Sequence, residues 1–300
     1  MACSDVSEIN FENLSIDEKD LWLMDVQELS DGTVMVSGGK LWNSGALYQL
    51  DGNALIKVLD TSKTLMHIEE FQEDVIAVGF DAYFFRRKAN NSEWNFTRLP
   101  DGDISKIFKG LAISQNRIIA VGGHGFMSGI IFTLDQNLEV VQNFDFNNEL
   151  SAVAHVRDNT WIAVGFGIVL KSDDNGETWN TLDITGDFFK DIQFVSDQVG
   201  YILGQSGTIL KTTNGGIEWE EIRSQSDFER VTGFNKFEFI DGNNAVIVAD
   251  DGQIYQSEDA GQSWRRFELN GAPDLLGLHY SDKSSVYVCG KNGFLARFSF

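Results

Sequence analysis

The chain has 300 residues, of which 42% are hydrophobic and 12% aromatic, so it can fill a substantial core and is not a disordered chain. It contains 29 glycines but only 2 prolines, a ratio that favours tight turns between closely spaced strands. Its net charge of −22 repels phosphate backbones and anionic lipid headgroups, which makes nucleic acid and membrane surfaces poor partners.

The first residues have two interpretations. Ala2 and Cys3, followed by small and acidic residues, look like the start left after a lipoprotein leader is removed. This predicts an extracytoplasmic protein, periplasmic or on the cell surface, anchored through Cys3. The alternative is an ordinary cytosolic start with an incidental cysteine. Cys289 has no Cys or His at metal-ligand spacing, so neither a structural zinc site nor a disulfide framework is expected.

A repeat organises the chain. Residues 162–179, 201–219 and 246–264 each show a strand, a turn that contains glycine, a second strand, a polar turn and a Trp. The small residue that ends the first of these strands recurs at Gly38, Gly79, Gly122, Gly165, Gly204, Ala249 and Gly290. The mean spacing of 42 residues is typical of a four-stranded propeller blade. Strand-like alternation flanks each position and no segment sustains a helical period, which excludes a helical solenoid.

Seven such positions predict an all-β fold, a single seven-bladed β-propeller domain. The blades are expected at approximately residues 21–60, 63–101, 104–145, 149–185, 187–225, 230–270 and 274–300. The last of these has room for only three strands. An alternating segment within residues 8–16 has no hairpin partner of its own, so we expect it to complete the last blade. Such closure removes exposed strand edges, which otherwise invite aggregation.

The polar turns have a structural interpretation. Residues 172–179 (SDDNGETW) fit the Asp-box or BNR pattern Ser-x-Asp-x-Gly-x-Thr-Trp. Residues 212–219 and 257–264 match the pattern with conservative changes, and residues 90–94 are a degenerate copy of it. A short acidic or amide side chain accepts from backbone N–H groups, Gly allows positive φ, and Trp anchors the turn. Calcium at Asp173, Asp174 and Glu177 is a weaker alternative, because the ligand order of an EF-type loop is missing.

The Asp-boxes together with Val-Gly-x-x-Gly-x-Ile-x-Lys-Thr strands resemble the photosystem II stability/assembly factor-like family of seven-bladed propellers. The resemblance is best from Tyr201 to Trp219, where Leu203 stands in for the Val, and it is specific over residues 149–300. It implies a non-enzymatic scaffold that grips another protein during assembly, outside the cytoplasm. No motif of the family identifies which residues contact a partner.

Sialidases also carry Asp-boxes, so a glycosidase is the rival hypothesis. Their usual Arg-Ile-Pro motif is absent, since the only prolines are Pro100 and Pro273. The paired arginines are expected near blade edges, on solvated faces: Arg86, Arg87, Arg265 and Arg266. The four histidines are His67, His124, His155 and His279, and each falls in a different blade. Three of the four are in predicted innermost strands. A metal in the channel is therefore a minor alternative to partly buried or turn histidines.

The pattern of the innermost strands indicates a set of residues that alternate with the apolar positions and could line the channel. These are Asp25, Gln27, Asp191, Gln193, Lys236, Glu238 and His279. The hypothesis is that they bind a protein or peptide partner, although a merely hydrated pore fits the same pattern. No catalysis, cofactor, metal or nucleic acid is expected, and the protein is expected to be a monomer. A carbohydrate-binding propeller or a sialidase-like glycoside hydrolase, with a glycan as ligand, is the alternative.

Overall fold

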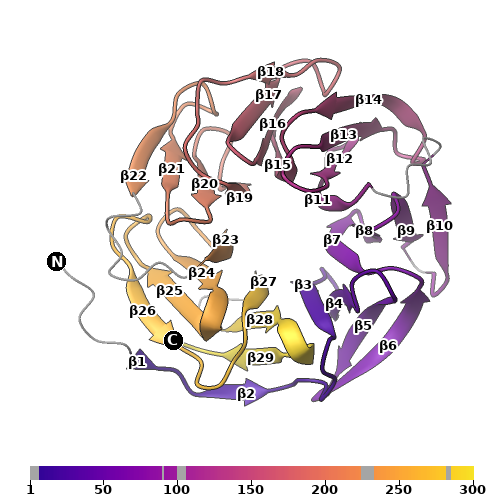
Figure 1. The fold of residues 1–300 in the computed structure, drawn as a ribbon, viewed down its shortest axis with the longest axis vertical. Helices are drawn as coiled ribbons and strands as arrows, with labels where there is room; N and C mark the ends of the chain where they lie inside the picture. Colours follow the sequence, from indigo (N-terminus) through magenta and orange to yellow (C-terminus); the bar gives the residue numbers. More distant parts are fainter. Residues whose placement is uncertain (1–6, 90, 100–105, 224–232, 282–284) are drawn as a thin grey trace.

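The structure is a computed structural model, and it describes residues 7–89, 91–99, 106–223, 233–281 and 285–300. Seven antiparallel sheets stand around a central opening (Figure 1). In every sheet the strand that comes first along the chain, apart from the N-terminal additions, lies innermost, and the later strands follow outward. This arrangement confirms the predicted all-β, seven-bladed propeller.

The first four blades are built from consecutive strands. Their strands are β3 (Trp22–Glu28), β4 (Val34–Gly39), β5 (Gly45–Asp51) and β6 (Ala54–Thr61); β7 (Leu65–Phe71), β8 (Asp74–Gly79), β9 (Tyr83–Arg87) and β10 (Trp94–Arg98); β11 (Phe108–Ile113), β12 (Ile118–Gly123), β13 (Gly129–Leu134) and β14 (Val140–Phe146); and β15 (Leu150–Arg157), β16 (Thr160–Gly165), β17 (Ile168–Ser172) and β18 (Asn180–Thr181).

The last three blades follow the same order, with two short 3₁₀ turns before the third strand of blades 6 and 7. Their elements are β19 (Phe189–Phe194), β20 (Gly200–Gly204), β21 (Ile209–Thr212) and β22 (Glu220–Arg223); β23 (Phe234–Phe239), β24 (Ala245–Ala249), η2 (Asp250–Gly252), β25 (Gln253–Ser257) and β26 (Arg265–Glu268); and β27 (Leu275–Tyr280), β28 (Val286–Gly290), η3 (Lys291–Gly293) and β29 (Leu295–Phe298).

The N-terminal segment completes the ring. Strand β2 (Phe11–Asn13) pairs antiparallel with β29, with Phe11 opposite Phe298, so the predicted completion of the last blade is confirmed (Figure 1). The segment divides into two short strands, because β1 (Ser7–Glu8) instead pairs parallel with β26 and adds a fifth strand to blade 6. Blades 6 and 7 are therefore fastened by the same stretch of chain.

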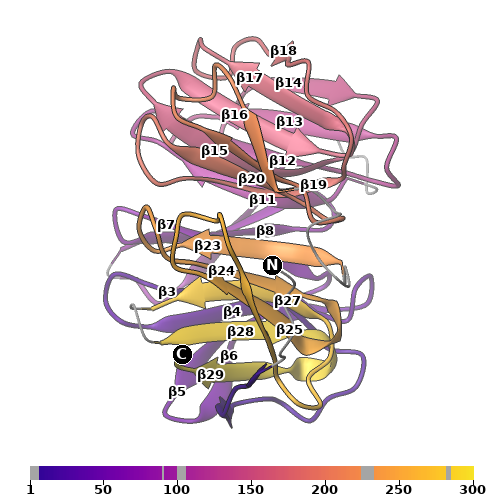
Figure 2. The ribbon, with the colours of Figure 1, turned by 90° about the vertical axis from the view of Figure 1, so that its left-hand side faces the viewer.

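The hydrophobic core is divided between the blades. Seven clusters of buried side chains each combine residues of two neighbouring sheets, and together they run around the whole ring. One of them packs Trp161 of blade 4 against Ile119 and Ile131 of blade 3. Figure 2 shows the blades edge-on, packed face to face along the ring. Each blade is thus buried on both faces, which explains why the second strand of each blade is predominantly apolar.

The repeated small residue has a steric cause. A Cβ added at Gly122 would lie 1.8 Å from the carbonyl oxygen of Ile107, and one at Gly165 would lie 2.0 Å from that of Glu149. In both cases the carbonyl belongs to the residue just before the innermost strand of the same blade. The end of the second strand therefore has to approach the backbone too closely for a larger side chain.

A second feature repeats in all seven innermost strands. Each contains a β-bulge near its start, where one extra residue stands between two successive paired positions of the strand. The extra residues are Met24, Met66, Lys109, Ser151, Lys190, Asn235 and Leu276, and all seven line the central opening. The bulge thus turns one additional side chain per blade toward the channel.

Candidate functional site at the centre of the ring

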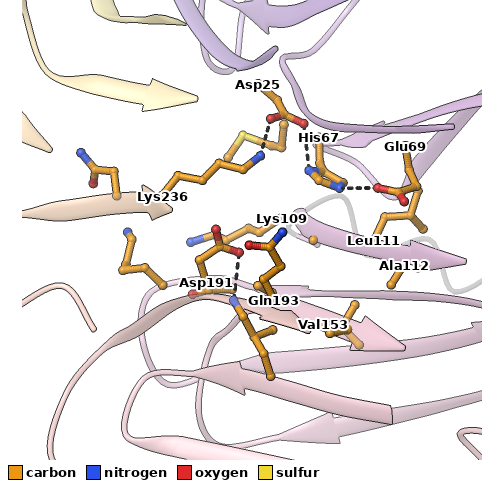
Figure 3. Close-up of a pocket in the computed structure, with 18 of the residues that line it drawn as sticks. Asp25, His67, Glu69, Lys109, Leu111, Ala112, Val153, Asp191, Gln193 and Lys236 are labelled. Atoms are coloured by element: carbon orange, nitrogen blue, oxygen red, sulfur yellow. Dashed lines mark hydrogen bonds and ion pairs between the residues drawn. The ribbon is translucent and has the colours of Figure 1, made fainter. Parts of the chain in front are cut away.

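The innermost strands of all seven blades enclose a cleft of about 470 Å³, called here the central cleft (Figure 3). Besides the seven bulge residues, its wall includes the residues that follow them: Asp25, His67, Gly110, Ala152, Asp191 and Lys236. At these positions blades 3 and 4 contribute the small residues Gly110 and Ala152, and Ala112 and Ala154 follow two residues further along. Small residues therefore make up this part of the cleft wall.

An ionic network crosses the central cleft. The Lys236 ammonium lies 2.5 Å from one carboxylate oxygen of Asp25, and Nδ1 of His67 lies 2.9 Å from the other (Figure 3). Lys236 comes from blade 6 and Asp25 from blade 1, although blade 7 stands between them. Blade 7 presents Gly277 at this level, where a Cβ would be 2.8 Å from the Asp25 Cα. Because Gly277 has no side chain, strand β27 of blade 7 can approach strand β3 of blade 1 closely.

Burial and charge shift the pKa values of this network in opposite ways. Burial favours the neutral form of Asp25, whose side chain is 3% exposed, but the charges of Lys236 and His67 outweigh it and hold its pKa well below the usual range. Burial likewise opposes protonation of His67, yet the Asp25 carboxylate raises the pKa of that histidine to about 9. Asp25 and its two cationic partners are therefore all charged at neutral pH.

Two other carboxyl groups have raised pKa values because burial disfavours their charged form. Burial raises the pKa of Asp191 to about 6, with Lys236 acting in the opposite direction. Burial also raises the pKa of Glu238 to about 7. Burial lowers the pKa of His279, whose Nδ1 lies 3.7 Å from a Glu238 carboxylate oxygen. Asp191 and Glu238 therefore change charge at or just below neutral pH.

Several of the predicted channel residues also join one blade to the next. Asp25 accepts from the Ile68 N–H at 3.0 Å, and Glu238 accepts from the Tyr280 N–H at 3.0 Å. Asp191 accepts from the Phe237 N–H at 3.3 Å. Gln193 bonds both the N–H and the carbonyl of Phe239. Each therefore satisfies backbone groups of a neighbouring innermost strand, which have no sheet partner on that side.

The predicted site residues are only partly brought together. Asp25, Asp191, Gln193 and Lys236 line the central cleft. Gln27, Glu238 and His279 follow two residues further along innermost strands β3, β23 and β27, outside the lining of the cleft.

Sequence reasoning missed cationic and hydroxyl groups at the bulges, above all Lys109, Ser151 and Lys190. A Phe-Lys pair at 108–109 and again at 189–190 was the available signal. Strict period-two alternation assigns those lysines to the wrong face, because it takes no account of the bulge.

Two of the four histidines, His67 and His155, line the central cleft. His155 also contacts the carbonyl of Asp158 and the ring of Trp161, while His124 lies beside Trp42, outside the cleft wall. Among the described residues, no group of three or more His, Cys, Asp or Glu side chains is arranged to hold a metal ion. The four paired arginines lie on β9 and β26, outside the wall of the central cleft.

The polar turns form closed hydrogen-bond networks. Ser172 donates to Asp174 and accepts from the Gly176 N–H, and Asp174 accepts from both the N–H and the hydroxyl of Thr178. The turn that starts at Ser257 repeats all of these contacts, and the turn that starts at Thr212 repeats them except that Asn214 donates to the Glu218 carboxylate in place of the hydroxyl contact. All three connect the third and fourth strands of a blade, so they lie on the side away from the central cleft.

The sequence comparisons support the resemblance that the repeats indicated. The family model described as "Photosynthesis system II assembly factor YCF48" matches residues 182–278. The photosystem II assembly lipoprotein Ycf48 of Synechococcus sp. (strain CC9902) is 26% identical over 140 residues, which are 43% of this chain and 40% of that protein. The chloroplastic photosystem II stability/assembly factor HCF136 of Oryza sativa subsp. japonica is 37% identical over 119 residues, 35% of this chain and 28% of that protein. The matches thus span less than half of these relatives.

Structural comparisons extend the likeness to the whole ring. YCF48 from Cyanidioschyzon merolae superposes with a TM-score of 0.70 at 14% identity, over 96% of this chain and 98% of the other. A catalytically inactive virginiamycin B lyase from Staphylococcus aureus gives a TM-score of 0.73 at 12% identity, over 98% and 100% of the two chains. At such identities the likeness concerns the fold alone. The chain is therefore a seven-bladed β-propeller that resembles the photosystem II assembly factor-like family, with its sequence similarity concentrated in the second half.

Proposed function

We propose that this propeller is a non-enzymatic scaffold that binds a segment of a protein partner in the central cleft, outside the cytoplasm. The observation that carries the proposal is the composition of the cleft wall. The cationic side chains of Lys109, Lys190 and Lys236 and the carboxylates of Asp25 and Asp191 together line about 470 Å³ of open space. Closely mixed charges suit a polypeptide segment, which offers amides and side chains of both signs, better than a small apolar ligand.

The placement of the arginines supports a binding role over sialidase chemistry. Arg86 is held by Asp74 and donates to the Gln136 carbonyl, and Arg265 lies over the ring of Phe267. These side chains lie on outer strands, away from the central cleft. A sialidase would need its arginine cluster inside the cleft, because there it would bind the substrate carboxylate. Within the described chain, the cleft wall contains no arginine.

Selection of displayed random peptides on the full chain tests the proposal, with a glycan array and a fluorogenic sialoside as parallel arms. We expect peptides that bind wild type and lose binding to Ala112→Trp, which places a large side chain at a small residue of the cleft wall. Ala54→Trp, on exposed strand β6, is the matched control and should bind as wild type does. Absence of any selected peptide, equal binding by Ala112→Trp, or turnover of the sialoside would contradict the proposal.

The extracytoplasmic part of the proposal rests on Cys3 and on a similar protein that is named a lipoprotein. Cys3 lies outside the described residues. Mass spectrometry of the protein isolated from its native cells tests this part: a lipid-modified N-terminal cysteine is expected. An unmodified peptide that contains Cys3, recovered from the cytosolic fraction, would show that the location is wrong.

A further inference from the structure

Loops of blades 3, 4 and 5 form an exposed apolar surface beside the central cleft. Phe126 lies between β12 and β13, Phe166 between β16 and β17, and Phe188 immediately before β19. Their ring centroids are 5.1 to 5.8 Å apart in all three pairs, so the rings pack on one another. Phe126, Met127 and Phe166 are 53%, 78% and 42% exposed. We call Phe126, Met127, Phe166 and Phe188 the aromatic patch.

The backbone at the centre of the aromatic patch is strained. Phe126 has φ +66, a left-handed conformation that is unfavourable for a bulky residue. The buried Glu149 maintains it: its carboxylate accepts from the Phe126 N–H at 2.7 Å, and its own N–H donates to the Phe126 carbonyl at 3.0 Å. A structure that holds a phenylalanine in this conformation and exposes its ring points to a role for that ring in recognition.

The aromatic patch is continuous with the central cleft. The Lys190 ammonium lies 4.7 Å from the centre of the Phe188 ring, and the Lys190 side chain also lines the cleft. Glu149 makes a second connection, because it contacts Lys109 of the cleft wall as well as the Phe126 backbone. Innermost strands β11, β15 and β19 stand side by side at this part of the opening (Figure 1).

Two polar groups at this border have neither a hydrogen bond nor an ion pair to any residue that the structure describes. Lys190 is half-buried and forms no ion pair there, and burial lowers its pKa although Asp250 and Asp191 act in the opposite direction. The Ser151 hydroxyl is buried, 9% of the residue being exposed, and has no hydrogen-bond partner. An incoming carboxylate would stabilise a poorly solvated ammonium and could accept a bond from the hydroxyl after rotation of its side chain.

We propose that the aromatic patch and Lys190 together bind a polypeptide segment in which an apolar side chain stands close to a carboxylate. The inference rests on the proposed function and specifies its partner. The apolar side chain packs on Phe126 and Phe166, and the carboxylate pairs with Lys190 at the rim of the central cleft. Charge complementarity favours this occupant, because Lys190 is a cation without an ion pair to any residue that the structure describes. A lipid surface is less suited, since the polar groups here face a cleft.

The peptides selected on wild type provide the probes. We expect them to be enriched in an aromatic or aliphatic residue close to Asp or Glu. Fluorescence anisotropy should show binding weakened about tenfold by each of Phe126→Ser, Phe166→Ser and Lys190→Met, with partial recovery in Lys190→Arg. The matched control is Phe96→Ser, since Phe96 is 68% exposed on outer strand β10 and should not affect binding.

The outcomes separate the two proposals. Peptides that lose binding to Ala112→Trp but keep it with the three patch variants would overturn this inference and leave the proposed function standing. Enrichment of basic peptides would overturn the inference as well. Failure to select any peptide would overturn both. A vesicle flotation assay tests a membrane surface as the alternative. The inference would be overturned if the protein floated with phosphatidylcholine vesicles in a manner that depends on Phe126 and Met127, while these residues had no effect on peptide binding.

Discussion

Lys236 and Asp25 are 211 positions apart in the sequence, yet their side chains form an ion pair in the central cleft, on the channel side of blade 7. The pair closes the ring on the side of the channel, and strands β1 and β2 close it on the outside. Both devices connect the two ends of the chain, where a ring of like blades would otherwise open. The stability of this propeller should therefore depend on a few residues at that junction.

Removal of the Asp25 carboxylate should destabilise the fold strongly. In Asp25→Asn the charges of Lys236 and His67 stay largely buried without their anion, which should lower the free energy of unfolding by about 3 kcal/mol. Urea unfolding at neutral pH measures this value. The control is Asp60→Asn, whose 2.9 Å pair with Lys57 is exposed and should contribute no more than about 0.5 kcal/mol. Equal effects of the two substitutions would contradict the assigned importance of the Asp25 network.

The same network should make stability fall in mildly alkaline solution. Asp25 raises the pKa of His67 from 6.5 to about 9, so between these values the native state retains a proton that the unfolded chain releases. The contribution of His67 is complete below pH 6.5 and is lost as the pH rises through about 9, a decrease of about 3 kcal/mol. Unfolding free energies measured across this window should decline less in His67→Gln. An identical decline in the two proteins would show that another group is responsible.

Removal of the Asp191 charge, unlike that of Asp25, should stabilise the protein above the folded-state pKa of Asp191. Burial raises its pKa from 3.8 to about 6, so its contribution to stability is present below pH 3.8 and is lost as the pH rises through about 6. Asp191→Asn keeps an acceptor for the Phe237 N–H and avoids the buried charge. The variant should be about 1 to 2 kcal/mol more stable than wild type well above the folded pKa. The gain should disappear toward pH 3.8 in matched unfolding experiments, and a gain independent of pH would contradict the explanation.

Gly277 should tolerate no side chain. A Cβ there would lie 2.6 Å from the Cys289 sulfur and 2.8 Å from the Asp25 Cα, both in the tightly packed space beside the ion pair. Gly277→Ala should therefore cost about 2 to 3 kcal/mol, as determined by denaturant unfolding. Gly242→Ala is the matched control, because no atom lies within 4 Å of its added Cβ and its stability should be unchanged. Similar stability of the two variants would refute the close approach.

Removal of the closing strands should open the ring. A chain without residues 1–13 exposes the edges of β26 and β29 and loses the contact of Phe11 with Phe294, whose rings are 5.9 Å apart. We expect the melting temperature to fall by roughly 10 °C and the protein to self-associate in size-exclusion chromatography with light scattering. Removal of residues 1–6 alone, which leaves both strands, should have neither effect. A monomeric, equally stable shortened chain would contradict the role of the closure.

Much of the architecture could be predicted because it rests on local requirements. The small residue at Gly122 or Gly165 is imposed by a carbonyl of the same blade, so its spacing reports the blade count directly. The closing strand could be inferred from a missing partner. The candidate site was harder to predict from the sequence. The alternating pattern identified Asp25, Asp191 and Lys236. It missed Lys109, Ser151 and Lys190, because each stands at a bulge that interrupts the alternation.

By itself, the order of residues determined the number of blades, the polar turns between outer strands and the use of the N-terminal segment in the last blade. Each of these depends on neighbours within one repeat or on a count of strands. Only the tertiary structure decided which charges meet in the central cleft and which loops bring Phe126, Phe166 and Phe188 together. The physical reason is that those contacts join different blades, and the distance between two blades is set by the closure of the whole ring.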